Sequence, residues 1–271
     1  MTELCHSFAK QLKSKLKDFS PDIALILGSG LGSVAKQIQN PKIIEYSSIK
    51  NFPQSTVSGH QGRFIFGSLQ GKNVLCMQGR IHLYEGHPPQ SIAQIIKTFK
   101  LLGIKKMIVT NAAGSLDTKM PAGSIMLITD HINFSFNNPL IGPNDENLGP
   151  RFPDMSNAYD KKLQELALKT ASNLKIKLFK GPYLMVSGPN FETAAEIKAF
   201  QLLGAKAVGM STVPEVITAA YCNIPVLGFS VITNLGTGLQ KTTQSHEETL
   251  NMATKAAQNL SNLISNLFER I

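Results

Sequence analysis

The segment 79–86 carries polar side chains at every second position. Arg80, His82 and Tyr84 would point to the same side if this segment is extended, because side chains of a strand alternate between its faces. An arginine can hold two oxygens of an oxyanion and a histidine can donate or accept a hydrogen bond, so the pattern predicts an anion site. The alternative is the exposed face of an edge strand. A metal site is not expected, because His82 and His87 lack a third histidine or cysteine at suitable spacing.

Three further segments are candidates for contact with an anion. The Gly-Ser-Gly sequence at 28–30 follows an apolar run and can cradle a phosphate with its N–H groups. Small residues at 110–114 would let a ligand approach the backbone. Ser211 precedes Thr212-x-x-Glu215, a capping-box pattern that predicts the positive end of a helix. Tight turns and helix capping are the alternative explanations.

Other residues suit a planar heterocycle. Phe191 can pack on such a ring while Glu192 accepts a hydrogen bond from its N–H group; the alternative is a surface glutamate beside a core phenylalanine. Asn234 closes an apolar run and can serve a donor and an acceptor together. His246 lies in a capping pattern at 245–248, where the helix dipole favours a neutral, hydrogen-bonding imidazole.

Most of these candidates directly follow an apolar run, which is where ligands bind in open α/β sheets. Apolar runs typical of strands alternate with apolar residues at helical spacing along most of the chain, so we expect an α/β fold. The expected strands are 23–27, a hairpin of 63–69 and 73–78, 107–110, 125–131, 183–187, 205–210 and 225–233; the expected helices are 3–17, one from Pro88-Pro89 to Gly103, 159–173, 193–203, 213–222 and 246–268.

Composition indicates a globular protein. The chain has 271 residues, of which 42% are hydrophobic, and no apolar run approaches the roughly 18 residues of a membrane helix. No linker, repeat or change of composition divides it, so we expect a single domain over 1–271. The stretch 133–158 has little periodicity, and such a long loop is usually functional or packed against a neighbouring chain.

Charge and cysteine content narrow the class further. The net charge is +9, but the lysines are scattered without interleaved aromatic residues, so we expect no nucleic acid partner and a field that favours a small anionic substrate. Cys5, Cys76 and Cys222 are far apart, which argues against a disulfide framework and a zinc site. The N-terminal region does not resemble a secretion signal, and we expect a cytoplasmic protein.

A long series of motifs in order identifies a family. They are 28–32 (GSGLG), 59–63 (GHQGR), 79–86 (GRIHLYEG), 111–114 (NAAG), 151–156 (RFPDMS), 188–193 (GPNFET), 208–215 (VGMSTVPE), Thr233-Asn234 and His246. With these motifs the chain resembles the trimeric purine nucleoside phosphorylases of the inosine/guanosine type.

The resemblance implies an α/β fold with a mixed central sheet flanked by helices, and a homotrimer with sites near subunit interfaces. It implies reversible phosphorolysis of inosine and guanosine, or their deoxy forms, in purine salvage, with phosphate as co-substrate and no metal or organic cofactor. By position, it assigns phosphate binding to Ser29, His60, Arg80, His82, Ser211 and the backbone at Ala112, ribose binding to Tyr84, Met210 and His246, base binding to Phe191, Glu192, Val208, Thr233 and Asn234, and a contact with an adjacent subunit's site to Phe152.

The mechanism that the resemblance suggests has an oxocarbenium-like sugar, with phosphate as the nucleophile and the purine leaving as an anion. Asn234 would bind the developing N7–H and O6, and Glu192 would bind N1–H. These two residues and His82 are the predicted catalytic residues. In animal members of the family a lysine stands where this chain has Leu235, and the following loop is longer, so lid behaviour is not carried over.

The same residues bear on substrate choice. Related enzymes that prefer 6-aminopurines, such as methylthioadenosine phosphorylases, have an acidic residue in place of Asn234. An amide there, with Glu192, fits hypoxanthine and guanine, and His246 fits a free 5′-hydroxyl, so we expect inosine and guanosine rather than adenosine. The alternatives are a phosphorylase that prefers methylthioadenosine or xanthosine, a hydrolytic nucleosidase, and a non-catalytic nucleoside-binding protein.

Overall fold

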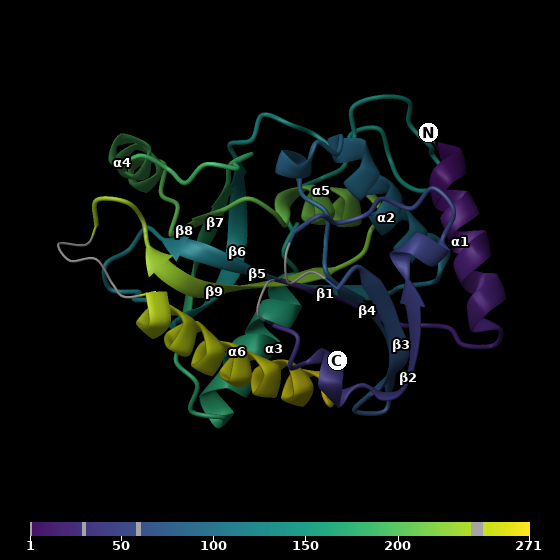
Figure 1. The fold of residues 1–271 in the computed structure, drawn as a ribbon, viewed down its shortest axis with the longest axis horizontal. Coiled ribbons are helices and arrows are strands. Elements are labelled where there is room, and N and C mark those ends of the chain that lie inside the picture. The colour runs from purple at the N-terminus through teal and green to yellow at the C-terminus, as the bar shows by residue number, and fades with distance from the viewer. Residues whose placement is uncertain (1, 29–30, 58–60, 240–245) are drawn as a thin grey trace.

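A mixed β-sheet forms the centre of the molecule, with helices on both of its faces (Figure 1). The computed structural model of the chain describes residues 2–28, 31–57, 61–239 and 246–271, and the side chains in these ranges except those of 2–3 and 246–253. Over these residues the sheet has nine strands in the order β2-β3-β4-β1-β5-β8-β7-β6-β9, and β5 also pairs with β9. Parallel and antiparallel pairs both occur, which confirms the expected α/β fold with a mixed sheet.

The elements follow the hydrophobic pattern of the sequence. β1 is an unbroken buried run, and the long helices each bury an apolar stripe against the sheet. The strands are β1 (Ile23–Leu27), β2 (Gln39–Glu45), β3 (Arg63–Leu69), β4 (Lys72–Gln78), β5 (Lys106–Ser115), β6 (Ile125–Asn133), β7 (Leu178–Met185), β8 (Ala207–Gly209) and β9 (Val226–Leu235); the α-helices are α1 (Thr2–Leu16), α2 (Pro89–Leu101), α3 (Lys161–Asn173), α4 (Ala194–Leu202), α5 (Val213–Tyr221) and α6 (His246–Phe268).

Two cores lie on opposite faces of the sheet. Helices α1, α2 and α5 pack on one face, where Phe64 and Phe99 are fully buried, and α3 and α6 cover the other face with residues such as Leu260 and Ile264 (Figure 1). At about 25 cal/mol per Å² of buried apolar surface, these two layers supply the main favourable contribution to folding. They hold the strand ends in place from both sides.

Strand β5 changes its neighbour partway along its length. On one edge it pairs with β1 as far as Val109 and with β8 only from Gly114, while on the other edge it pairs with β9 throughout. The edge at 110–113 is therefore open between the end of β1 and the start of β8. Such a point, where neighbouring strands diverge, is where α/β sheets bind ligands.

Several boundaries differ from those expected. The sequence does not predict β2, because six of its seven side chains are exposed at the edge of the sheet. β5 continues to Ser115, so 110–114 belongs to the strand rather than to a turn after it, because pairing with β9 continues through these small residues. β7 begins at Leu178, earlier than expected, and pairs there with β6.

Two local predictions are corrected. The segment 79–86 is extended only as far as His82, and Leu83–Glu85 forms a 3₁₀ turn, so the alternation expected for Tyr84 does not apply. Helix α5 does begin at Val213, but the Thr212 side chain does not cap it, so the predicted capping role of Thr212 is wrong. The capping box of Thr193 and Glu196 is complete.

Candidate active site

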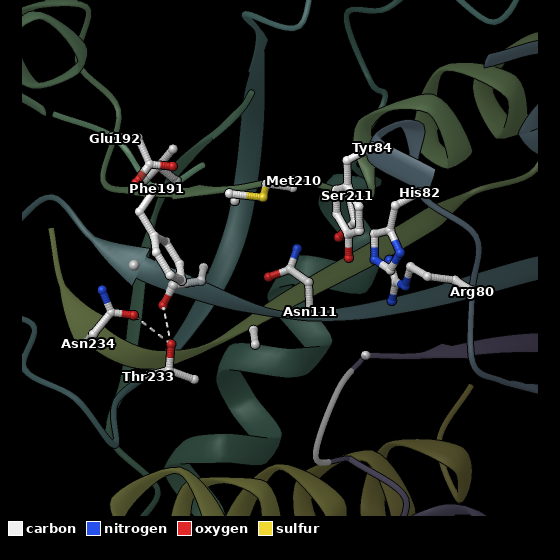
Figure 2. A pocket seen from close by; sticks show the side chains of 16 residues that line it. Arg80, His82, Tyr84, Asn111, Phe191, Glu192, Met210, Ser211, Thr233 and Asn234 are labelled. Atoms are coloured by element: carbon white, nitrogen blue, oxygen red, sulfur yellow. Dashed lines mark hydrogen bonds between the residues drawn. The ribbon is translucent and has the colours of Figure 1, made fainter. Parts of the chain in front are cut away.

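A cavity of about 350 Å³ opens at the free edge of β5 (Figure 2). Gly28 closes one side at the end of β1, where its N–H group donates to Thr110 Oγ1 at 3.0 Å. A Cβ atom on Gly28 would lie 2.7 Å from Asn111 Cα, so only glycine lets the two strands come this close. The lining residues are Gly28, Arg80, His82, Tyr84, Asn111, Ala112, Ala113, Gly114, Phe191, Glu192, Val208, Gly209, Met210, Ser211, Thr233 and Asn234.

A buried ion pair stands at one end of the cavity. Arg80 is only 1% exposed, and its Nη1 lies 3.2 Å from Glu215 Oε1 and 3.1 Å from Thr212 Oγ1. Its Nη2 donates to the carbonyl of Thr110. Burial raises the pKa of Glu215, and Arg80 opposes that rise. Either of these buried charges would be costly without the other, so the ion pair holds the Arg80 side chain in place before any ligand binds.

His82 is held in a similar way next to Arg80. The Nδ1 atom of the His82 ring lies 3.0 Å from Glu85 Oε1, and the backbone N–H group of His82 donates to the same oxygen at 2.7 Å. Thr56 donates to the other oxygen of Glu85 through its backbone N–H group and its hydroxyl. Burial raises the pKa of Glu85, but these hydrogen bonds outweigh it and leave the pKa below its usual value. The ring of Tyr84 stacks on that of His82, with 4.6 Å between centroids.

Polar residues of β5 and of the β8–α5 connection meet beside the ion pair. Asn111 Nδ2 donates to Thr212 Oγ1 at 2.9 Å, while Asn111 Oδ1 is buried and has no hydrogen-bond partner among the described residues. Ser211 Oγ lies 3.2 Å from the same Thr212 oxygen. The cavity wall therefore carries a hydroxyl and an amide next to a guanidinium.

The other end of the cavity is more open and carries different chemistry. Phe191 is 78% exposed, and Glu192 is half-buried, where burial raises the pKa of its carboxyl and nearby Glu196 adds to the rise. Asn234 Oδ1 accepts from Thr233 Oγ1 at 2.8 Å, and its Nδ2 donates to the Leu235 carbonyl at 3.0 Å. Both hydrogen bonds of the Asn234 amide are made to adjacent residues of the chain, and a bound heterocycle can replace these partners.

The structure brings together many of the sequence-predicted site residues. In Figure 2, Arg80, His82, Tyr84 and Ser211 gather at one end of the cavity, and Phe191, Glu192, Thr233 and Asn234 at the other. Ala112, Val208 and Met210 also line it, from β5, β8 and the segment after β8. The individual roles that the resemblance assigns to these residues remain predictions.

Some predicted residues lie elsewhere or outside the description. Phe152 is 88% exposed and does not line the cavity. Ser29 and His60 lie outside the residues that the structure describes, as does Ser245 of the third capping pattern. His246 is the first residue of α6, as expected, but its side chain also lies outside the description.

Sequence reasoning did not predict that several further residues take part in the site. Asn111, Glu85 and Glu215 stand in quoted motifs, but their partners come from distant segments. A signal was present for two of them: Asn111 interrupts an apolar strand, and Glu215 is the only charged residue in the apolar helix Val213–Tyr221. A buried polar residue in an apolar element needs a partner, which the sequence alone does not name.

The two ends of the cavity fit two different ligand groups. Arg80, His82 and Ser211 can bind an oxyanion, whereas Glu192 and Asn234 can bind the polar edge of a ring packed on Phe191. Among the described residues, no group of three or more histidine, cysteine or acidic side chains is placed to hold a metal ion. The described helices include none long and apolar enough to cross a membrane.

Comparison with known proteins shows the family to which the chain belongs. Residues 22–269 match the family described as the phosphorylase superfamily. Purine nucleoside phosphorylase 1 of Bacillus subtilis is 50% identical over 87% of this chain and 87% of its own length, and purine nucleoside phosphorylase of Mus musculus is 46% identical over 94% and 90%.

Solved structures of Schistosoma mansoni purine nucleoside phosphorylase superpose on the chain. The complex with inosine has a TM-score of 0.92 at 37% identity and covers 99% of this chain and 96% of that one. The complex with adenosine has the same TM-score at 38% identity, with 99% and 97% covered. The chain belongs to the phosphorylase superfamily and, within it, to the purine nucleoside phosphorylases.

Proposed function

We propose that this enzyme catalyses the reversible phosphorolysis of 6-oxopurine ribonucleosides and deoxyribonucleosides, chiefly inosine and guanosine. The products are the free base and (deoxy)ribose 1-phosphate, a step of purine salvage. The observation that carries the proposal is one cavity with the buried Arg80 at one end and Glu192 with Asn234 at the other. With phosphate bound at one end and the purine at the other, the sugar of the nucleoside would lie between them, with phosphate and base on its opposite sides.

The chemistry at the sugar needs stabilisation of charge at both ends. Arg80, His82 and Ser211 would hold phosphate as the nucleophile, and the positive charge that develops on the sugar would be attracted to it. The purine departs with negative charge; as N7 takes up a proton from water, the Asn234 amide would accept from N7–H and donate to O6. Glu192 would accept from N1–H. In this proposal the leaving group is stabilised by hydrogen bonds rather than by a strong acid.

Substrate choice follows from the same two residues. A 6-oxopurine gives Glu192 a donor at N1 and gives the Asn234 amide an acceptor at O6. Adenine reverses both groups and leaves buried polar atoms without partners, which can reject a substrate by several orders of magnitude in rate. The Schistosoma enzyme was solved with adenosine as well as with inosine, so binding alone does not measure this preference.

A coupled assay tests the reaction and the base class together. Xanthine oxidase converts hypoxanthine to uric acid, and the rate with inosine is measured with and without phosphate; adenosine is followed in parallel through the release of adenine. We expect turnover of inosine only with phosphate and little turnover of adenosine. Cleavage without phosphate would instead indicate a nucleosidase, and binding without cleavage a nucleoside-binding protein.

We also propose a homotrimer in which Phe152 reaches the site of the adjacent subunit. The exposure of Phe136, Ile141 and Phe152 on the long loop 133–158 supports a protein interface there. Light scattering on the native protein is expected to give three times the chain mass of 29.5 kDa. Phe152→Ala should raise KM for inosine about tenfold without changing KM for phosphate; an unchanged inosine KM would contradict the assignment.

Two further expectations accompany the function. We propose that catalysis needs no metal or organic cofactor, so dialysis against EDTA should leave the rate unchanged. A cytoplasmic location is supported by the three cysteines, which are buried and form no disulfide in the described structure. Fractionation of the native host cells is the direct test of location.

A further inference from the structure

Thr212 adopts a backbone conformation that threonine rarely tolerates. Its φ of +78° is in the left-handed region, where a β-branched side chain is strained, and the residue is fully buried at the N-cap of α5. A threonine at this position normally bonds its hydroxyl to a free N–H group of the helix, but the Thr212 side chain makes no such bond. The Thr212 hydroxyl therefore does not cap the helix, and its hydrogen-bond partners lie elsewhere.

The hydroxyl meets three polar groups of the cavity wall. Its oxygen lies 3.1 Å from Arg80 Nη1, 2.9 Å from Asn111 Nδ2 and 3.2 Å from Ser211 Oγ. Arg80, Asn111 and Ser211 all line the cavity and are labelled in Figure 2. Thr212 itself does not line the cavity, so it stands behind three residues that do.

Hydrogen-bond counting fixes the direction of the Thr212 proton. A hydroxyl has one proton and two acceptor lone pairs. Arg80 Nη1 and Asn111 Nδ2 are both donors, and together they occupy the two lone pairs. The remaining neighbour is Ser211 Oγ, so the proton of Thr212 is donated to Ser211.

A second buried hydroxyl holds the backbone of Ser211. Tyr183 is fully buried, and its phenol oxygen accepts from the Ser211 N–H group at 3.4 Å. With Thr212 donating to its oxygen, the Ser211 hydroxyl has its own proton to offer. Because Ser211 lines the cavity, that proton can be donated to a ligand there.

We propose that Thr212 is a positioning residue of the phosphate end: its hydroxyl makes Ser211 a donor toward the cavity and holds the Asn111 amide with Oδ1 as a free acceptor. The inference rests on the proposed function, because it assigns phosphate to this end. The end then presents Arg80 and Ser211 as donors beside one acceptor, Asn111 Oδ1, a set that fits an oxyanion next to a hydroxyl group. The strain at Thr212 is the structural cost of placing its hydroxyl there.

Removal of the hydroxyl tests the proposal. Thr212→Val keeps the shape of the side chain, and Thr212→Gly also removes the strain at positive φ and so guards against a folding failure. Both variants should raise KM for phosphate about tenfold or more, the usual effect of a lost hydrogen bond in a network that binds a charged group, while KM for inosine changes less than about threefold. Thr212→Ser should restore the phosphate KM to within about threefold of the native value.

A matched control separates positioning from packing. Thr218 is a fully buried threonine of the same helix whose hydroxyl donates to the Pro214 carbonyl at 2.8 Å, and it does not line the cavity. Thr218→Val should leave both KM values near native. If the Thr212 variants lower only the yield or kcat and leave the phosphate KM unchanged, Thr212 is a structural residue and the proposal is wrong.

Binding without turnover distinguishes this proposal from the proposed function. Phosphate should raise the Tm of the native protein and of Thr212→Ser, but shift that of Thr212→Val and Thr212→Gly much less. If inosine is not cleaved but this pattern holds, the function fails and the role of Thr212 stands. If inosine is cleaved and all variants respond equally to phosphate, the function stands and the role of Thr212 is refuted.

Discussion

The two ends of the cavity are built in different ways. At the phosphate end, Arg80, Asn111 and Thr212 are almost fully buried and are joined by hydrogen bonds to one another. At the base end, Phe191 is 78% exposed, and within the described part of the chain the Asn234 amide bonds only to its sequence neighbours Thr233 and Leu235. One end is complete before a ligand binds, whereas the other has groups that must exchange partners when the purine arrives.

The difference has a physical origin in the fold. The phosphate end is assembled from β5, the start of α5 and the segment after β4, all packed into the core, where an unpaired charge would be very costly. The base end lies between the end of β9 and the segment that precedes α4, nearer to solvent. Binding groups can therefore be changed at the base end with little loss of stability, while those at the phosphate end also support the fold.

The largest effect is expected at Arg80. Arg80→Met leaves the carboxylate of Glu215 buried without its partner, so the free energy of unfolding should fall by about 3–5 kcal/mol, and phosphate-dependent turnover should fall at least about a thousandfold. Urea denaturation and initial rates measure the two effects. The double variant Arg80→Met with Glu215→Gln should recover most of the stability and none of the activity. Loss of activity without loss of stability would contradict the contrast between the two ends.

A change at Asn234 should affect activity alone. Asn234→Ala removes one contact to the leaving base and is expected to lower kcat/KM for inosine by about 10²–10³, or about 3–4 kcal/mol, as for deletion of an oxyanion-hole donor. The free energy of unfolding should change by less than about 1 kcal/mol, because the residue is only half-buried and bonds locally. Asn234→Asp should in addition raise the ratio of adenosine to inosine turnover, and an unchanged ratio would refute the base assignment.

The smallest effect concerns the pH dependence at Glu192. Burial raises the pKa of Glu192, and the negative charge of Glu196 raises it further. As the pH falls through this raised pKa, the carboxylate is protonated and loses its capacity to accept from N1–H, so kcat/KM for inosine should decline on the acid side. Glu196→Gln removes one cause of the raised pKa and should move this decline to lower pH.

Glu196→Gln should remove the charge at this position and leave helix α4 intact. Glu196 caps α4 by accepting from the Thr193 N–H group, and glutamine can make the same bond, so the helix is retained. Far-ultraviolet circular dichroism should be unchanged. An acid limb that does not move in Glu196→Gln would show that Glu192 does not control it.

Elements of this fold that depend on local signals could be predicted from the sequence, and elements without such signals could not. Strands such as Ile23–Leu27, and helices opened by Pro88-Pro89 or by the capping box at Thr193, were predicted because hydrophobic periodicity and capping are local signals. The edge strand Gln39–Glu45 was missed because its exposed polar residues carry no such signal. The same limit applies to the site.

Motifs located the cavity, but they did not reveal how its walls are held. The predicted residues at 80–84, 112, 191–192, 208–211 and 233–234 line one cavity, although these five segments lie far apart in the sequence. The pairing of Arg80 with Glu215 joins segments far apart in sequence, which periodicity cannot show. At Thr212 the local pattern predicted helix capping, and tertiary contacts with Arg80 and Asn111 prevailed instead.

The central claim is that phosphate attacks the sugar of a purine nucleoside in this cavity. Phosphorus NMR of the native enzyme with inosine and phosphate tests it most directly, because the technique reports where the phosphorus ends. We predict a new resonance of ribose 1-phosphate that grows in a one-to-one ratio with hypoxanthine. Release of hypoxanthine with free ribose, while the inorganic phosphate signal stays constant, would contradict the claim.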